Sequence, residues 1–241
     1  KVRLIVFGTL AVLLILFSVF SEQLTPYDPY LQDLSNAKAP PSAEHLLGTD
    51  RYGRDMLSRV IVGSRTSIFS TLLLVAVITV LGTAVGVFCG WNGRWMDTVL
   101  MRISDMFLAF PGLVFALAVA GSLGGGLQNA ILALAAISWP KYARIARSQT
   151  LAQKETVWMK AAKLSGSSSG KLIFKHILPN IIGPILVTAM LDIGTMMMEL
   201  AALSFLGLGA KPPTAEWGSM MSDTRSLMTT SPWITFSPGI A

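Results

Sequence analysis

Two carboxylates, Asp192 and Glu199, stand in a long apolar stretch of the sequence. A charge at the centre of an inserted helix costs roughly 2.5–3.5 kcal/mol, so both side chains should face protein or water rather than lipid. Thr195 and Met196 fall between them at the offsets that complete the same helical face. This face either lines a path for a cation or a chelated cation, or each carboxylate pairs with an arginine, such as Arg102, or a hydroxyl of a neighbouring helix.

Other chemistry has little support in the sequence. One cysteine and two histidines cannot build a cysteine metal cluster or a histidine pair within an apolar segment. The run 166–171 resembles a phosphate-binding loop, but it has three residues between its glycines instead of four, and Leu172 stands where a Ser or Thr is needed. We therefore predict no catalytic residue, no ATPase site and no firmly assigned metal ligand. A membrane-embedded enzyme with the two carboxylates as acid and base is a rival interpretation that lacks a nucleophile.

Composition indicates what surrounds these residues. Hydrophobic residues make up 52% of the 241-residue chain and charged residues only 13%, whereas a soluble domain usually carries about 25% charge. The mean hydropathy is +0.59. These values argue against a cytosolic enzyme and for a protein whose solvent is largely lipid.

Long uncharged segments predict an all-α membrane protein, a polytopic helical bundle. One span each is expected at 4–21, at 66–93 and near 181–205, and two spans at 106–140, joined by a glycine turn at 121–126. A sixth span begins near Trp233, where few residues remain, and the chain begins with Lys. We therefore expect about six transmembrane helices with the last one truncated, in a segment of a longer protein.

The distribution of charge predicts the orientation of the spans. The stretch 141–175 has eight basic residues and one acid, which marks it as cytoplasmic, and Lys1 and Arg3 then also lie inside. The stretch 22–65 has six acids and five bases, as an external loop tolerates. Because topology explains the net charge of +6, nucleic-acid binding is excluded.

Two further patterns predict contacts between helices. Gly82, Gly86 and Gly90 recur every fourth residue, which puts them on one face where a neighbouring backbone can approach closely. We interpret this face as internal packing rather than as a subunit-dimerisation surface. Arg102 and Asp105 are three residues apart and are expected to form a salt bridge near the cytoplasmic surface.

The cytoplasmic stretch resembles the signature of binding-protein-dependent ABC transporter permeases, in which Glu-Ala-Ala is followed by Gly and, nine residues later, by Ile-x-Leu-Pro. The spacing is kept in full, but Lys160 replaces the Glu and His176 replaces the first Ile. In that family the segment forms short coupling helices that dock on the ATP-binding subunit. Pro179 is expected to stop one helix before the next span. The resemblance implies coupling roles for Lys160, Ala161, Ala162, Gly166, His176, Leu178 and Pro179.

A second resemblance narrows the family. The segments 47–55, 203–209 and 212–218 look like the second, C-type permease of the dipeptide, oligopeptide and nickel group, and the match runs from about Pro26 to the end. Segment 191–197 looks more like the nickel permeases than the peptide permeases. The resemblance therefore favours import of nickel as a chelate, with di- or oligopeptide import as the alternative. The residues implied in contact with a binding protein, or in the outer mouth, are Asp50, Arg54, Asp55, Glu216 and Trp217.

The resemblance also implies an assembly, a type I ABC importer. The chain would form a heterodimer with a second permease chain in membrane lipid, with two ATP-binding subunits and an external solute-binding protein. ATP and magnesium would sit on the partner subunits, and no cofactor on this chain. The setting would be a bacterial or archaeal cytoplasmic membrane. Residues 1–65 would form the first helix and the external loop, and 66–241 the permease core, with a coupling segment at about 147–180. A passive channel, the third interpretation, needs no ATPase dock.

Overall fold

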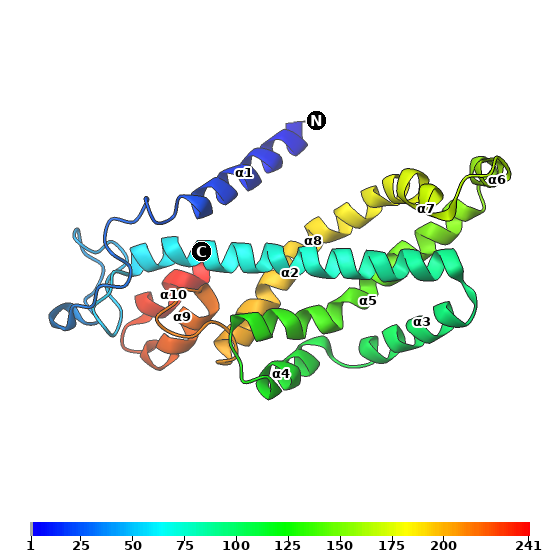
Figure 1. Ribbon diagram of the computed structural model, residues 1–241. Helices are drawn as coiled ribbons and strands as arrows, with labels where there is room; N and C mark the ends of the chain where they lie inside the picture. Colours follow the sequence, from blue (N-terminus) through cyan, green and yellow to red (C-terminus); the bar gives the residue numbers. More distant parts are fainter. Residues whose placement is uncertain (1) are drawn as a thin grey trace. The chain divides into compact units, whose positions relative to one another are not determined.

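The computed structural model describes residues 2–241, with side chains from Ile5 onward, and the regular structure in this range is helical (Figure 1). Lys1 and the side chain of Arg3, used above to orient the N-terminus, lie outside it. In addition, Thr49 and Asp55 form an isolated antiparallel β-bridge. The main helices are α1 (Val2–Val19), α2 (Met56–Asn92), α3 (Arg94–Leu108), α4 (Gly112–Ser122), α5 (Leu127–Lys154), α6 (Val157–Leu164), α7 (Ser169–Leu172), α8 (Leu178–Phe205), α9 (Trp217–Thr224) and α10 (Pro232–Ile240). The predicted all-α class is confirmed.

The chain forms two compact units. The first unit consists of the chain up to Thr71 together with Ala120–Ala130 and Met197–Ala241, and the second of Leu72–Val119 and Ile131–Met196. Helices α2, α5 and α8 each contribute residues to both units. The loop between α1 and α2, which the sequence predicts to be external, belongs with α9 to the first unit, and the segment with the coupling signature belongs to the second.

Two helical segments are long and apolar enough to cross a membrane, Met56–Asn92 and Ser169–Phe205. The first covers the span predicted at 66–93 except for Gly93, and the second contains the span predicted near 181–205. Helices α3 and α4 meet at 92° and form a broken span or a re-entrant segment. The described apolar part of α1, Ile5–Val19, is shorter than the roughly 20 residues of a full crossing. The crossings predicted outside the two long segments stay predictions.

The helix boundaries within 106–140 differ from those expected. The predicted turn is present, since Gly124, Gly125 and Gly126 all adopt positive φ between α4 and α5. However, the chain also breaks before Gly112, where Pro111 cannot donate a backbone hydrogen bond and restricts the residue before it. The uncharged segment ends at Pro140, but the helix does not, because Pro140 lies inside α5.

The glycine stripe explains why α5 continues beyond its proline. A Cβ atom at Gly82 would lie 2.5 Å from Tyr142 Cβ, and one at Gly90 would lie 2.8 Å from Thr150 Cβ. A Cβ at Gly86 would overlap the carbonyl oxygen of Ala143. The turns of α5 after Pro140 thus pack directly on the backbone of α2 in the second unit. This close contact stabilises them, and the interpretation of the stripe as internal packing is confirmed.

The first unit has a small core of its own beside the external loop. Met56 at the start of α2 packs with Ala215, Met220 of α9 and Ile234 of α10, and Val62 completes this cluster of buried side chains. The hydroxyl of Thr235 donates to the carbonyl oxygen of Thr224 at 2.8 Å and so joins α10 to α9. The chain segment in which a sixth span was expected to begin is helix α10, which starts at Pro232 and packs on this core.

Candidate functional site

The segment with the coupling signature folds as α6, a tight turn and α7. At the end of α6 the amide of Gly166 donates to the carbonyl of Lys163 at 3.1 Å, and the amide of Ser167 donates to the carbonyl of Ala162 at 3.3 Å. This pair of bonds is a Schellman motif, which ends a helix through a residue in the left-handed region. Gly166 is that residue, with φ of +80°. Ser168 then caps α7 through a bond from the amide of Lys171.

The backbone conformation of Gly166 explains why a glycine stands there, whereas the family resemblance suggested close packing against a partner. A Cβ atom at this position would meet no atom of the chain within 4 Å. Within this chain, glycine is therefore required by the backbone and not by close packing, because a residue with a Cβ is disfavoured at positive φ. Its small size would matter only toward another protein.

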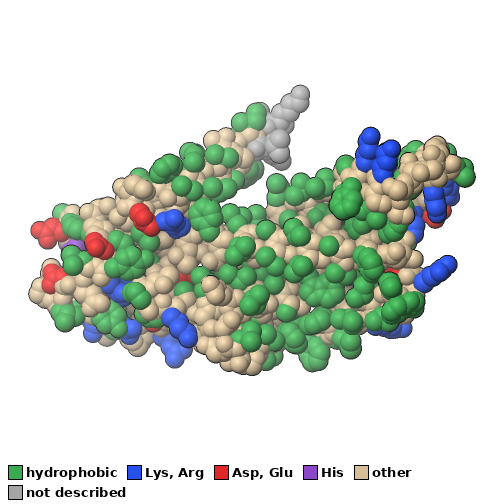
Figure 2. Space-filling view, in the orientation of Figure 1, with side chains coloured by type: hydrophobic (Ala, Val, Ile, Leu, Met, Phe, Trp, Pro, Cys, Tyr) green, Lys and Arg blue, Asp and Glu red, His purple; other side chains and the backbone are tan. Residues whose placement is uncertain are grey.

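The coupling segment exposes large apolar side chains. Val157 is 84% exposed, Leu164 90% and Phe174 73%, whereas Met159 on α6 is buried. Lys and Arg side chains gather around α6 and α7, with hydrophobic side chains among them (Figure 2). Apolar surface of this kind, bordered by charge, is typical of a protein–protein contact.

The two residues that depart from the family signature have partners within the segment. Lys160 forms an exposed ion pair with Glu155 at 2.9 Å, and the Lys160 ammonium lowers the pKa of that carboxyl. The ring of His176 lies 5.6 Å from the ring of Trp158, so it links α6 to the residues that lead into α8. Their side chains therefore help to hold the segment together.

The junction with α8 differs from the prediction that Pro179 stops a helix. Residues Ile173–Ile177 form a π-helical turn, in which the amide of Leu178 donates to the carbonyl of Ile173, and the helix continues through Pro179. The wider turn gives room for a residue that has no backbone donor and whose ring crowds the preceding turn. The end of the coupling segment is thus continuous with the apolar span Ser169–Phe205.

Asp192 on α8 is buried and bonded to two side chains of α5. Its carboxylate accepts from Lys141 Nζ at 2.6 Å and from the Tyr142 hydroxyl at 2.9 Å. Lys141 is about half exposed, whereas the Asp192 side chain is 8% exposed. Of the two uses considered for this carboxylate, the structure has the pair with a neighbouring helix. The partner is not Arg102, which is exposed on α3.

The other members of the predicted polar face lie in different surroundings. Thr195 is exposed and Met196 is buried, both in the second unit, while Glu199 is half-buried in the part of α8 that belongs to the first unit. Within the described residues no group of three or more His, Cys, Asp or Glu side chains could hold a metal ion. The predicted face is therefore not assembled around a metal.

Helix α5 carries a row of paired basic side chains that sequence reasoning took only as a sign of topology. Arg147 makes two bonds to the Asp97 carboxylate, at 2.5 and 2.6 Å, and these bonds raise the pKa of Arg147. Arg144 pairs with Asp105, so the expected bridge from Arg102 to Asp105 is wrong. Both acids lie on α3, two helical turns apart, which is the spacing that could have suggested a facing basic helix.

Lys154 is the last residue of this row on α5, and its side chain lies at the C-terminal end of α2. Its ammonium donates to the carbonyl oxygens of Gly90 at 3.0 Å and Trp91 at 2.7 Å. A cation at a helix C-terminus satisfies orphan carbonyls and matches the helix dipole. In the second unit, α5 is thereby attached to α2, α3 and α8 just before the coupling segment begins.

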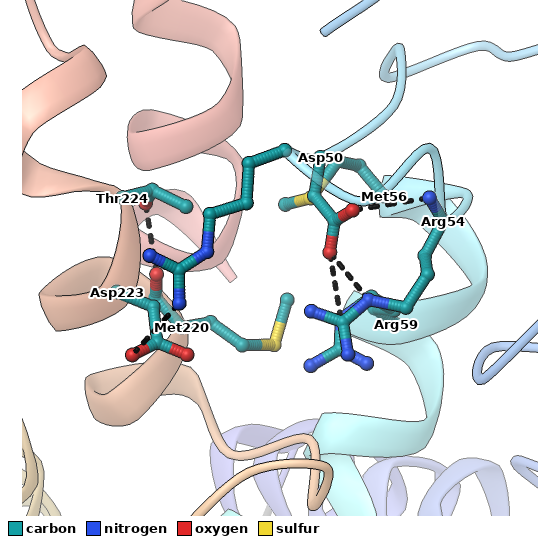
Figure 3. Close-up of a pocket in the computed structure, with 8 residues that line it drawn as sticks. Asp50, Arg54, Met56, Arg59, Met220, Asp223 and Thr224 are labelled. Carbon is teal, nitrogen blue, oxygen red and sulfur yellow. Dashed lines mark hydrogen bonds and ion pairs between the residues drawn. The ribbon is translucent and has the colours of Figure 1, made fainter. Parts of the chain in front are cut away.

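The external loop contains a buried ionic cluster. Asp50 accepts from Arg54 Nε at 2.6 Å and lies 3.7 Å from Arg59 Nε, and these three side chains are at most 6% exposed. At its edge Arg51 and Asp223 of α9 approach to 3.9 Å, and Figure 3 shows the cluster between the loop, α2 and α9. Two of the residues predicted at an outer mouth, Asp50 and Arg54, are thus internal partners of one another.

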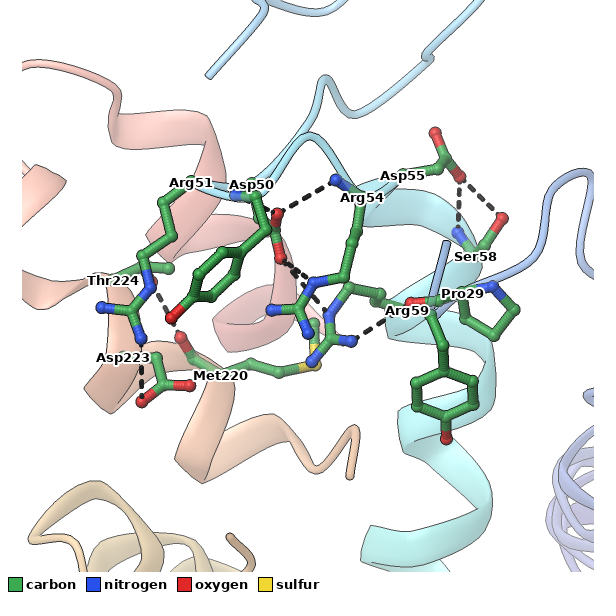
Figure 4. Close-up of polar contacts among 12 residues, drawn as sticks. Pro29, Asp50, Arg51, Arg54, Asp55, Ser58, Arg59, Met220, Asp223 and Thr224 are labelled. Atoms are coloured by element: carbon green, nitrogen blue, oxygen red, sulfur yellow. Dashed lines mark hydrogen bonds and ion pairs between the residues drawn. The ribbon is translucent and has the colours of Figure 1, made fainter. Parts of the chain in front are cut away.

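The remaining three residues predicted at the outer mouth cap helices or fasten them. The Asp55 carboxylate accepts from the amide and hydroxyl of Ser58 at the start of α2 (Figure 4). The buried Glu216 carboxylate accepts from the amides of Gly218 and Ser219 at the start of α9. Trp217 Nε1 donates to the carbonyl of Val60 at 3.0 Å. These contacts determine the shape of the first unit, and leave the side chains little capacity for an outside partner.

Comparison with known proteins gives close relatives across the whole chain. Residues 82–241 match the family described as binding-protein-dependent transport system inner membrane component. The chain is 41% identical over 227 residues to the dipeptide transport system permease protein DppC of Alkalihalophilus pseudofirmus, with 94% of this chain and 75% of that protein covered. It is 39% identical over 229 residues to the nickel transport system permease protein NikC of Escherichia coli, with 95% and 83% covered.

A solved structure has a similar fold at low sequence identity. The inward-facing MetNI methionine ABC transporter superposes with a TM-score of 0.57 at 17% identity, over 77% of this chain and 93% of that one.

Proposed function

The chain belongs to the family of binding-protein-dependent transport system inner membrane components, and on that basis we propose that it is the permease subunit of an ATP-driven ABC importer. Its fold is that of a type I importer permease. The observation that carries the proposal is the coupling segment, which has the family spacing and exposes Val157, Leu164 and Phe174. Hydrophobic side chains of this size on a basic cytoplasmic segment need a partner surface.

The proposed partners follow from the family to which the chain belongs and from the exposed coupling segment. One of two ATP-binding subunits would receive the α6–α7 surface, a second permease chain would complete the path, and an external solute-binding protein would deliver the solute. ATP and magnesium would be held by the ATP-binding subunits. Closure of the ATPase dimer would then move α6, and α5 would transmit the movement through its bonds to Asp97 on α3 and Asp192 on α8.

For the solute we propose two candidates, nickel carried as a chelate and a di- or oligopeptide. The similarity of 191–197 to nickel permeases favours the first, whereas over nearly the full chain the similarity to a dipeptide permease and to a nickel permease is almost equal and supports both. Asp192 is engaged by Lys141 and Tyr142, so it is a poor ligand for a bare cation. Nickel would therefore pass as a chelate, a small polar solute comparable with a dipeptide.

Uptake by cells that carry the complete transporter tests both the proposed permease function and the identity of the solute. Radioactive nickel and a labelled dipeptide are supplied in parallel, with a strain lacking this chain as control. Uptake of one solute that depends on this chain and on ATP assigns the substrate. Copurification with an ATP-binding subunit separates a transporter from a channel or a membrane-embedded enzyme. A chain that never copurifies with an ATPase, and whose loss leaves both uptakes unchanged, would contradict the proposal.

A further inference from the structure

The buried ionic cluster of the first unit surrounds a small cavity. Its volume is about 10 Å³, which is the space needed for one water-sized particle. The lining residues are Asp50, Arg51, Arg54, Met56, Arg59, Met220, Asp223 and Thr224. Figure 3 shows Arg54 and Arg59 on one side of this cavity and Asp223 and Thr224 on the other.

The buried charges beside this cavity do not balance. Arg54 and Arg59 share one carboxylate, that of Asp50. This carboxylate also accepts from the amides of Tyr52 at 2.8 Å and Arg54 at 3.0 Å, so its capacity to accept is largely used. At the rim, Arg51 and Asp223 are each about one third exposed and compensate one another. One positive charge in the buried group is left without a counter-ion.

The other nearby carboxylate does not supply it. Asp55 is turned toward Ser58, as Figure 4 shows, and it also contacts Nδ1 of His45 at 2.9 Å. Its charge lies at the N-terminus of α2, where it caps the helix. The cavity is therefore lined by Asp50 and Asp223 alone among the acids of the described residues.

The two guanidinium groups also have donors to spare. An arginine carries five N–H donors. Arg59 donates through Nη1 to the carbonyl of Pro29 at 3.1 Å, and its Nε faces Asp50. Arg54 donates through Nε to Asp50, and its guanidinium lies over the ring of Tyr52, 4.7 Å from the ring centroid. The terminal nitrogens of a buried arginine thus border a cavity that could hold an acceptor.

We propose that this cavity binds one small monovalent anion of halide size from the surrounding solution. A water molecule would fill the volume but leave the buried positive charge uncompensated, which is costly in a low-dielectric site. An anion would instead accept charge-assisted hydrogen bonds from Arg54 and Arg59. The volume excludes acetate and sulfate. The bound anion fastens the external loop to the start of α2, on the same unit as α9.

The experiment uses the purified complete transporter at constant ionic strength. Thermal unfolding is measured in sodium gluconate with increasing chloride or bromide, and in parallel with acetate or sulfate. We expect chloride and bromide to raise Tm by about 2–4 °C and to saturate, as a ligand of the folded state does. Acetate and sulfate should give no saturable rise. Equal effects of all four anions would overturn the proposal, because they would indicate general salt screening.

Two variants locate the effect. Arg54→Gln removes a cavity donor and should abolish the halide-dependent rise in Tm. Arg65→Gln changes an exposed arginine that pairs with the exposed Glu22, and should retain the full rise. A halide-dependent rise that persists in Arg54→Gln would contradict the assignment.

A direct measurement is independent of whether Arg54→Gln folds. Crystals of the wild-type complex grown in bromide should show an anomalous peak between the guanidinium groups of Arg54 and Arg59. Density without anomalous signal at that point would identify a water and overturn the proposal. A carboxylate of the binding protein seated between the two arginines would overturn it as well.

Discussion

Lys141 Nζ lies 2.6 Å from Oδ1 of Asp192, and this contact joins α5 to α8. Most of the coupling segment lies between the end of α5 at Lys154 and the start of α8 at Leu178. The ion pair therefore ties together the two helices that flank this segment, although Lys141 and Asp192 are 51 positions apart in the sequence. In the proposed transporter, a movement of α6 would therefore reach both helices together.

Neutralising Lys141 and neutralising Asp192 should lower the free energy of unfolding by different amounts. Lys141→Met leaves the buried Asp192 carboxylate without its cation, while Asp192→Asn leaves a lysine that is half exposed and can reach water. We expect Lys141→Met to lower the free energy of unfolding by about 1–3 kcal/mol, and Asp192→Asn to lower it by less. Unfolding of the purified complex measures both. The double variant should be more stable than Lys141→Met alone, and a strictly additive loss would contradict the pairing.

Substitutions of Gly166 can show whether this position needs glycine for its positive φ or for close contact with an ATP-binding subunit. If positive φ is the requirement, Gly166→Asn should be tolerated better than Gly166→Ala, because asparagine enters the left-handed region more easily, and the alanine variant should cost about 1–2 kcal/mol at this turn. If close contact with an ATP-binding subunit is the requirement, the smaller alanine should be tolerated better. Amide hydrogen exchange at 161–167 reports the turn itself.

Transport assays on the same Gly166 variants extend this test to coupling. A bulky residue such as leucine should abolish uptake while the protein still inserts in the membrane. Normal substrate-stimulated ATPase activity in Gly166→Leu would be incompatible with a coupling role. Gly170→Ala is a suitable control, since Gly170 lies in the same segment, has no neighbouring atom within 4 Å of a Cβ and does not adopt positive φ.

The contact between α2 and α5 should be sensitive to a single methyl group. A Cβ at Gly86 would lie 2.7 Å from Ala146 Cβ and overlap the backbone of α5. Gly86→Ala should therefore destabilise the second unit by about 1–3 kcal/mol through overpacking. The folded fraction after a thermal challenge in detergent measures the loss. Gly194→Ala on α8 is the matched control, because a Cβ there meets nothing within 4 Å, and it should leave that fraction unchanged.

Glu216 is expected to act as a helix cap in the first unit. Its carboxylate is buried and accepts two amide hydrogen bonds at the start of α9. Glu216→Ala leaves these buried donors unsatisfied and should cost about 1–3 kcal/mol, measured by thermal unfolding. Glu44→Ala removes an exposed carboxylate of the external loop and should have little effect. Equal stability of the two variants would show that the cap does not contribute.

Sequence reasoning predicted the features that depend on local pattern. The apolar runs predicted the helices at 66–93 and near 181–205, and the spacing of Gly82, Gly86 and Gly90 predicted a close helix contact. The turn at 121–126 followed from its glycines. In each case the information lies within a few turns of chain, where helix geometry relates residues directly.

The partners of charged residues could not be predicted in the same way. Asp192 bonds to residues 50 and 51 positions away, and Asp97 bonds to a residue 50 positions away. Such pairs depend on how helices pack, and the local pair from Arg102 to Asp105 was favoured only because it is visible within one helix. The local sequence also does not show that α5 continues through Pro140, since packing of the next turns on α2 outweighs the local cost of a proline.

The row of basic residues on α5 has a consequence for how the protein is made. In the folded second unit Arg144, Arg147 and Lys154 are bound by acids or carbonyl oxygens, so their charges are largely compensated. A chain that is still entering the membrane has none of these bonds, and there the same side chains would be free cations that favour the predicted cytoplasmic location of their segment. Orientation during biosynthesis and cohesion of the finished bundle thus depend on one set of side chains, used at successive times.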